Sequence, residues 1–294
     1  MDNMRADLDS LNPSVDWGSG DRRDFLRAAL GTGFAAAVLP VMAQTMIRTD
    51  IDGLLAGEVM IRSGDLDMRA YRAQPEGKSQ LPVVLVVSEI FGVHEHIADI
   101  ARRFAKLGYL AIAPELFQRQ GDPRQYESIP DLISKVVSKA PDEQVMRDLD
   151  ACVAWAGRHQ GDTQQLGVTG FCWGGRITWL YAAHNPRVKA AVAWYGKVVQ
   201  DKTPLQPQNP IDMAASLRVP VLGLYGGKDA GIPLEGVDRM RDALSRGKSG
   251  SEIVVYPDAG HAFHADYRPS YRETEARDGW RRCVDWMRRH GVSA

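Results

Sequence analysis

Short apolar runs alternate with stretches of helical periodicity along most of the chain. Residues 83–87 form an uninterrupted, mainly β-branched run, which is typical of a strand buried on both faces. Further strands are expected at 109–113, 166–171, 188–195, 219–225 and 253–256. Between them, apolar residues recur at helical spacing over 97–107, 145–156 and 276–287. Alternating strands and helices predict an α/β fold with a mostly parallel sheet and helices on both of its faces.

Two segments depart from this alternation. Residues 58–73 alternate apolar and polar side chains, which predicts antiparallel edge strands. Their apolar members are Val59, Ile61, Leu66, Met68 and Ala70. The segment 197–209 is rich in Pro, Gln and Lys and has no period, so we expect a long surface loop that could cap a site. No repeat or linker divides the rest, and residues 44–294 are expected to form a single domain.

Composition narrows the class of protein. With 294 residues, 44% apolar and 25% charged, the chain has the profile of an ordinary globular protein. Its 36 basic and 37 acidic residues give a formal net charge of -1, which does not favour nucleic acid or a membrane surface as a partner. The three cysteines are an odd number and form no CxxC or Cys/His cluster, so neither a disulfide framework nor a metal site is expected.

The first 43 residues are expected to lie outside the fold. Arg22-Arg23 followed by Phe25-Leu26 resembles a twin-arginine export signal, and an Ala- and Gly-rich apolar stretch follows. Val41-Met42-Ala43 fits a signal-peptidase site. A cytosolic amphipathic helix is the alternative reading. We expect recognition by the twin-arginine export machinery, cleavage after Ala43, and a periplasmic protein of about 250 residues without stable membrane insertion.

A nucleophile motif stands where a predicted strand meets a predicted helix. Gly170-Phe171-Cys172-Trp173-Gly174 has the Gly-x-nucleophile-x-Gly pattern of the α/β-hydrolase elbow. Glycine is needed there because the turn is sharp and the strand and helix pass close to it. The helix N-terminus favours a thiolate, so Cys172 is expected to be the nucleophile, with the Trp173 N–H as an oxyanion donor. Cys152 and Cys283 fall on apolar helix faces and are expected to be buried packing residues.

Candidate acid and base groups follow the last two predicted strands. In α/β-hydrolases the chain order is nucleophile, acid, histidine, and Asp229 and His261 fit that order. Asp258 is a rival acid, although it is expected to cap a turn, and His264 is a weaker rival base. The expected chemistry is that His261 takes the proton of Cys172 while Asp229 orients the imidazole. Attack on a carbonyl then gives a thioester, which water hydrolyses.

With these residues in place, the chain resembles the dienelactone hydrolase family over nearly all of residues 44–294. The matching segments are Glu89-Ile90-Phe91-Gly92, Ala113-Pro114-Glu115-Leu116, Gly170-Phe171-Cys172-Trp173-Gly174-Gly175, Tyr195-Gly196 and the loops of Asp229 and His261. A cysteine in place of the usual serine, together with a Glu-Ile-Phe-Gly loop, is fairly specific to this family. The resemblance implies hydrolysis of a cyclic enol-lactone that carries a carboxylate, which gives an open keto-acid.

The resemblance also assigns roles to residues around the nucleophile. It implies that Glu89 interacts with the resting thiol and helps to activate it when substrate arrives. A solvated loop carboxylate is the alternative for that residue. The N–H of Ile90 is implied as the second oxyanion donor.

Substrate contacts are implied for Arg119 and Tyr195, with the arginine near the substrate carboxylate, although a solvated arginine is its alternative. The family has a second arginine four residues past the histidine, and this chain has Ala265 there. The nearest arginine is Arg268, whose own position offers an alternative route to an anionic substrate. Because two arginines grip a carboxylate better than one, a broader carboxylesterase specificity competes with the carboxylated lactone.

Two other classes of protein fit the sequence less well than a hydrolase does. A binding protein that kept the fold and lost activity is disfavoured, because nucleophile, base, acid and oxyanion loop all have candidates. A thiol redox protein would need a resolving cysteine close by in the sequence. We expect a monomeric ester or lactone hydrolase that uses no metal and no organic cofactor.

Overall fold

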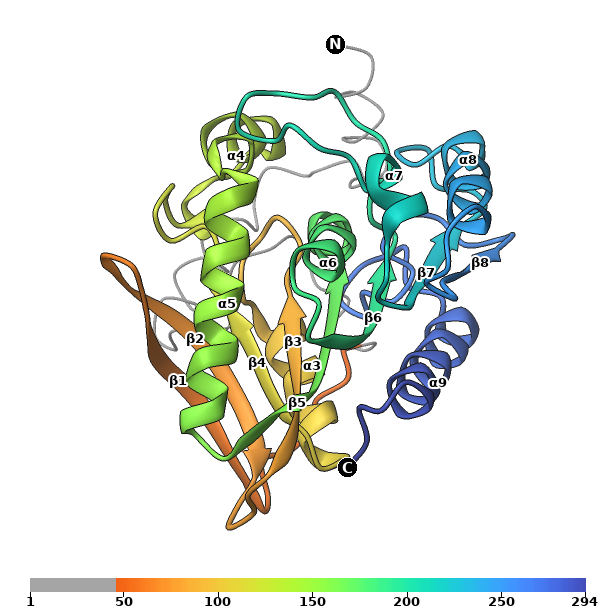
Figure 1. The fold of residues 1–294 in the computed structure, drawn as a ribbon. Coiled ribbons are helices and arrows are strands. Elements are labelled where there is room, and N and C mark those ends of the chain that lie inside the picture. Colours follow the sequence, from red (N-terminus) through yellow and green to blue (C-terminus); the bar gives the residue numbers. More distant parts are fainter. Residues whose placement is uncertain (1–45) are drawn as a thin grey trace.

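The computed structural model describes residues 46–294 and contains one eight-stranded sheet (Figure 1). The signal predicted for residues 1–43 lies outside the described residues. The strands are β1 (Leu54–Ser63), β2 (Leu66–Pro75), β3 (Leu81–Val87), β4 (Leu110–Pro114), β5 (Gly161–Phe171), β6 (Val188–Trp194), β7 (Val221–Gly226) and β8 (Glu252–Tyr256). Their order is β1-β2-β4-β3-β5-β6-β7-β8. The β1–β2 and β2–β4 pairs are antiparallel and the other pairs are parallel, which confirms the predicted α/β architecture.

Helices cover both faces of this sheet. They are α3 (Glu95–Lys106), α4 (Ile129–Lys135), α5 (Asp142–Arg158), α6 (Trp173–His184), α7 (Pro210–Met213), α8 (Leu234–Ser245) and α9 (Glu273–Arg289), with 3-10 turns η1 (Pro123–Gln125), η2 (Val137–Lys139) and η3 (Ala214–Ser216). On one face α6 packs beside α5, where Tyr181 donates a hydrogen bond to Asp150 (2.9 Å). On the other face α3 packs against α9, and the rings of Phe104 and Trp280 lie 4.8 Å apart (Figure 1).

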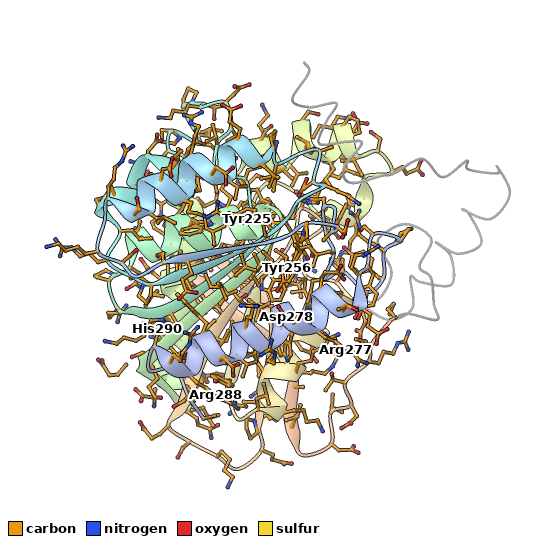
Figure 2. All side chains as sticks on the ribbon, turned by 90° about the vertical axis from the view of Figure 1, so that its right-hand side faces the viewer. Tyr225, Tyr256, Arg277, Asp278, Arg288 and His290 are labelled. Atoms are coloured by element: carbon orange, nitrogen blue, oxygen red, sulfur yellow. The ribbon has the colours of Figure 1, made fainter. Side chains whose placement is uncertain are left out.

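The middle of the sheet forms the core because both of its faces are covered. Every residue of β3, β4 and β7 is buried, so these strands are apolar runs and not alternating ones. Cys152 and Cys283 are fully buried in this core, as predicted. At the sheet edge, α9 is fixed to β8 by a hydrogen bond from the Tyr256 hydroxyl to Asp278 (2.8 Å), and both residues are labelled in Figure 2.

The parallel strands all end at one edge of the sheet, and the loops that follow them there carry the predicted site. The segment 197–209 contains no helix or strand, which agrees with the predicted loop. The helix α8 was not predicted, although its buried residues Val237, Met240 and Leu244 have helical spacing. Among residues 46–294, no helix is both long enough and apolar enough to cross a membrane.

Candidate active site

Cys172 occupies a strained turn between β5 and α6. Its backbone angles are φ 55° and ψ −115°, a region that residues other than glycine seldom adopt. Such a conformation costs about 1–3 kcal/mol and is common at functional sites. The Cys172 amide donates a hydrogen bond to the carbonyl of Trp194 at the end of β6 (3.0 Å), which fixes the turn against the neighbouring strand. The side chain is half-buried, so the elbow presents its sulfur at the sheet edge.

Two glycines allow the elbow to form. A Cβ atom at Gly170 would lie 2.3 Å from the carbonyl oxygen of Gly174. A Cβ atom at Gly174 would lie 2.3 Å from the carbonyl oxygen of Val87, at the end of β3. Both distances are far inside van der Waals contact, so any side chain would push the helix away from the strands. The glycine pattern that predicted the elbow therefore reflects close backbone packing.

Asp229 and His261 form a buried pair next to the elbow. His261 Nδ1 lies 2.7 Å from Asp229 Oδ2, and the two side chains are 6% and 2% exposed. Burial lowers the pKa of His261, but the charges of Asp229 and Cys172 outweigh burial and raise the pKa to about 10. The other ring nitrogen, Nε2, is buried, and Cys172 also contributes to the raised pKa of His261, so the imidazole interacts with the carboxylate and with the thiol. This arrangement suits proton exchange between His261 and Cys172.

The rival acid and base lie in different environments. Asp258 is exposed and pairs with Lys228 (2.7 Å) at the surface. His264 is buried among aromatic rings. The centre of its ring lies 4.5 Å from that of Trp194 and 5.4 Å from that of Phe171. Burial lowers the pKa of His264 well below its usual range, so this side chain is a neutral core histidine.

Glu89 is not a solvated loop carboxylate. It is 2% exposed, and its Oε2 accepts a hydrogen bond from His94 Nε2 at 3.0 Å. Burial raises the pKa of Glu89, but the hydrogen bond and charge of His94 outweigh it and lower the pKa to about 2. The charges of Glu89 and Cys172 both act on the Tyr195 hydroxyl, so the carboxylate and the thiol share a neighbourhood.

A cavity of about 150 Å³ brings Cys172 and His261 together with three other predicted residues, Ile90, Trp173 and Tyr195. The remaining lining residues were not singled out from the sequence. They are Ile133, Val137, Ser138, Arg176, Lys197, Gln200, Gln206, Gly231 and Ile232. Three of them belong to the segment 197–209, so the predicted capping loop does line the site. The length of this segment and its lack of periodicity were the sequence features that predicted a loop over a site.

The two predicted arginines are placed differently. Arg119 donates to both oxygens of Asp148 (2.9 Å and 2.7 Å) and to the Ser63 carbonyl (2.7 Å), so its guanidinium is occupied away from the cavity lining. Arg268 is 6% exposed and lies over the rings of Phe91 and Tyr267, at 5.2 Å and 5.8 Å. It does not line the cavity, but its charge acts on the Tyr195 hydroxyl, which does.

Buried polar atoms without a partner gather around the elbow. Within the described residues they include Glu89 Oε1, Trp173 Nε1, Tyr195 OH, His261 Nε2, Tyr267 OH and Arg268 Nη2. Unpaired buried polar atoms are rare in folded proteins, and their concentration here fits a site that binds a polar ligand. In residues 46–294 no group of three or more His, Cys, Asp or Glu side chains is arranged to hold a metal ion.

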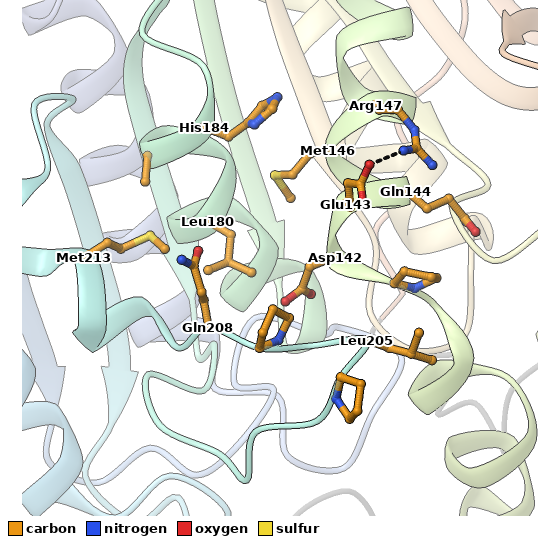
Figure 3. Close-up of a pocket in the computed structure, with 14 residues that line it drawn as sticks. Asp142, Glu143, Gln144, Met146, Arg147, Leu180, His184, Leu205, Gln208 and Met213 are labelled. Carbon is orange, nitrogen blue, oxygen red and sulfur yellow. Dashed lines mark hydrogen bonds and ion pairs between the residues drawn. The ribbon is translucent and has the colours of Figure 1, made fainter.

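A larger groove of about 590 Å³ lies on the other side of the 197–209 loop (Figure 3). Its charged groups already have partners. Asp142 pairs with Arg176 (2.7 Å), Glu143 pairs with Arg147, and His184 pairs with Asp150 (2.8 Å). The cavity at Cys172 is therefore the better candidate site, although it is smaller.

Comparisons with known proteins identify the family of this chain. The model of the Dienelactone hydrolase family matches residues 68–291. A provisionally named carboxymethylenebutenolidase of Methylorubrum extorquens is 60% identical over 289 residues, which cover 98% of each chain. A protein of the same provisional name from Escherichia coli K12 is 56% identical over 261 residues, covering 88% of this chain and 96% of its own. The crystal structure of a provisionally assigned dienelactone hydrolase from Klebsiella pneumoniae has a TM-score of 0.79 and 58% identity, covering 80% of this chain and 98% of that one.

Proposed function

Because this chain belongs to the dienelactone hydrolase family, we propose that it cleaves a small ester or lactone with Cys172 as nucleophile, His261 as base and Asp229 as the orienting acid. The chain is a carboxylic ester hydrolase. The observation that carries the residue assignment is the buried His261–Asp229 pair, whose remaining ring nitrogen is on the side of the half-buried thiol. An oriented imidazole beside a thiol is the arrangement that nucleophilic catalysis by cysteine requires.

The proposed reaction has two halves. The proton of Cys172 passes to His261, and the thiolate attacks the carbonyl carbon of the ester. The N–H groups of Ile90 and Trp173 donate to the resulting oxyanion. His261 then protonates the departing alkoxide, which leaves a thioester on Cys172. Water attacks that thioester and gives a proton to His261. The intermediate then releases the carboxylic acid and the Cys172 thiolate, and His261 returns the proton to sulfur.

Substrate contacts and activation belong to the same proposal. Glu89 assists the thiol, and Tyr195 lines the acyl-binding cavity. Arg268 is the better placed of the two arginines for an anionic group, because it is buried, its charge lowers the pKa of Tyr195, and its Nη2 has no partner among the described residues. A carboxymethylenebutenolide-like lactone is the first candidate substrate.

A broad carboxylesterase is the second candidate, and one observation favours it. Arg119, which the family resemblance assigns to the substrate carboxylate, is held by Asp148 and Ser63. With Ala265 in the place of the family's second arginine, the site has less cationic character than two free arginines would give. Neutral esters then become competitive substrates.

The test is hydrolysis of p-nitrophenyl acetate and of a carboxylated dienelactone by the full chain and by Cys172→Ala. Cys283→Ala is the matched control, because that cysteine is fully buried in α9. We expect the wild type and the control to turn over at least one compound and Cys172→Ala to turn over neither. A folded wild type that acts on neither compound would overturn the proposed substrate class and favour a binding protein.

We also propose that the twin-arginine machinery exports the chain and that it works as a periplasmic monomer. The support is the Arg22-Arg23 motif with the apolar stretch and the Val41-Met42-Ala43 site that follow it. Replacing Arg22 and Arg23 by lysine should keep the chain in the cytoplasm, as measured by cell fractionation. An unchanged distribution, or a periplasmic form that retains residue 1, would contradict this part of the proposal.

A further inference from the structure

A second carboxylate–histidine pair lies beside the nucleophile. Glu89 and His94 are joined at 3.0 Å, with side chains 3% and 8% exposed. Glu89 follows β3 by two residues, and the backbone at Val87 and Ser88 is in tight contact with the elbow at Gly174. The backbone that leads into this pair therefore packs against the elbow of Cys172 from the β3 side, whereas His261 lies on the loop after β8.

The ring of His94 is held on two sides. It stacks on the ring of His96 (6.1 Å, 19°) and meets the ring of Tyr267 edge-on (4.9 Å). His96 is fixed in turn by its Nδ1, which lies 3.1 Å from Asp266 Oδ1. These contacts fix the direction of the Nε2–H bond, so that it meets Glu89 Oε2.

One oxygen of the Glu89 carboxylate takes no part in the hydrogen bond with His94. Glu89 Oε1 is buried and has no hydrogen-bond partner among the described residues. The charges of Glu89 and Cys172 both raise the pKa values of the Tyr195 and Tyr267 hydroxyls, in addition to burial. The spare oxygen thus belongs to a buried carboxylate that shares its polar neighbours with the thiol.

We propose that His94 is a positioning residue for catalysis, which holds Glu89 as an oriented carboxylate beside Cys172 and leaves Oε1 for the groups that react there. The inference rests on the proposed role of Cys172 as nucleophile. Its physical basis is that a carboxylate in a buried site is costly unless it is hydrogen-bonded or paired. Without the donor, burial would raise the pKa of Glu89, so the carboxylate would lose its charge at a higher pH than in the wild type.

Several titratable or charged groups act on Glu89 or on the tyrosine hydroxyls that Glu89 and Cys172 both influence. His94 and His96 lie at the start of α3, Cys172 lies at the elbow, and Tyr195 follows β6. Tyr267 and Arg268 come from the loop after β8. The test must therefore separate a specific effect of His94 on Glu89 from a general change in the charge of the site.

The rate at which iodoacetamide alkylates Cys172 separates these effects. It is measured on the full chain by intact mass spectrometry at several pH values. In Glu89→Gln a negative charge near the thiol is lost, which favours the thiolate, so we expect alkylation near pH 6 to become faster, by up to about tenfold. His94→Phe keeps a ring for stacking but removes the Nε2 donor. We expect its rate to approach that of Glu89→Gln at the acid end of the pH range, where an unpaired buried carboxylate takes up a proton, and that of the wild type at the alkaline end.

Three further variants make the result decisive. His94→Gln has a side-chain amide that can donate to Glu89, and we expect it to keep the wild-type profile. If His94→Phe does not fold, His94→Asn replaces it, because its shorter amide should not reach the carboxylate. The double variant of Glu89→Gln with His94→Phe should behave like Glu89→Gln alone, since His94 then has no carboxylate to hold.

The role of His94 would be overturned if the alkylation rate of His94→Phe changed by the same factor at every pH or did not change at all. Additive effects in the double variant would also overturn it. Alkylation does not require ester turnover, so the result stands apart from the proposed function. A chain with the expected profile that hydrolyses no ester would contradict the hydrolase mechanism and leave the His94 inference standing. A chain that hydrolyses esters with an unshifted His94→Phe profile would do the reverse.

Discussion

Two histidine–carboxylate pairs in this protein have nearly the same length and very different surroundings. His261 and Asp229 are 2.7 Å apart with side chains 6% and 2% exposed. His184 and Asp150 are 2.8 Å apart, and both side chains are 40% exposed. Water screens the second pair, and exposed pairs contribute about 0–1 kcal/mol to stability. The first pair is desolvated, and the carboxylate together with Cys172 raises the pKa of His261 to about 10.

The cavities beside these pairs differ in the same way. The groove near His184 is the larger of the two, but its charged groups satisfy one another (Figure 3). The cavity at Cys172 is smaller and contains buried polar atoms with no partner among residues 46–294. Burial with unpaired polar groups, and not size, therefore marks the site in this molecule.

The largest expected effect comes from removing the imidazole of the buried pair. His261→Gln should lower kcat/KM for p-nitrophenyl acetate on the order of 10⁴-fold, because the general base is lost. His184→Gln is the matched control and should leave kcat/KM unchanged, since the groove has no part in the proposed chemistry. Steady-state kinetics with equal active-site titres would check both variants. A similar loss in the two variants would show that the effect is structural.

The buried pair should also make stability depend on pH. The pKa of His261 is raised from 6.5 to about 10 on folding, so folded protein binds the proton more tightly than unfolded protein. The stabilisation is fully present below pH 6.5 and is lost as pH rises toward 10, by at most about 1.4 kcal/mol per pH unit. Asp229→Asn removes the main favourable charge and should flatten this part of the curve. Urea unfolding at several pH values would measure it.

His261→Gln provides the second check on that slope. It removes the titrating group, so its curve between pH 7 and 9 should be about as flat as that of Asp229→Asn. Equal slopes in the wild type and both variants would assign the pH dependence to other groups.

Some features of the candidate site could be predicted from the sequence because they depend on topology or on local backbone packing. Cys172, Asp229 and His261 follow strands that end at one edge of a parallel sheet, so topology alone predicts that they approach one another. The glycines around Cys172 are a local signal, because each one makes room for backbone that the motif itself brings close. Both kinds of information lie in short stretches of sequence.

Ion pairing was not predictable in this way. Asp148 lies 29 residues from Arg119, and nothing local indicates that both of its carboxylate oxygens accept hydrogen bonds from Arg119 Nη1. The bond between Glu89 and His94 spans five residues, but it depends on how β3 enters α3 and on Tyr267, far along the chain. The partner of a long charged side chain depends on which groups the tertiary structure brings within reach. The local sequence therefore gives little indication of how charged residues pair.

Specificity for a carboxylated lactone should separate the two arginines. Arg268→Lys loses the planar donors beside Tyr195, and we expect kcat/KM for the carboxylated lactone to fall roughly tenfold while that for p-nitrophenyl acetate stays constant. Arg119→Lys should change neither value, because that side chain pairs with Asp148. The ratio of the two rates in each variant is the measurement. A fall in the ratio for Arg119→Lys alone would restore the role that family resemblance gives it.

The smallest effect is expected at the exposed pair. In His184→Gln the free energy of unfolding should drop by no more than about 0.5 kcal/mol, because solvent screens the lost interaction. Asp150 keeps its hydrogen bonds from Tyr181 (2.9 Å) and Asn185 (3.1 Å), so no carboxylate is stranded by the change. Urea unfolding at neutral pH gives the number. A loss above about 2 kcal/mol would mean that the exposed pair is as costly to break as a buried one, and exposure would no longer explain why only one of the two histidines is suited to catalysis.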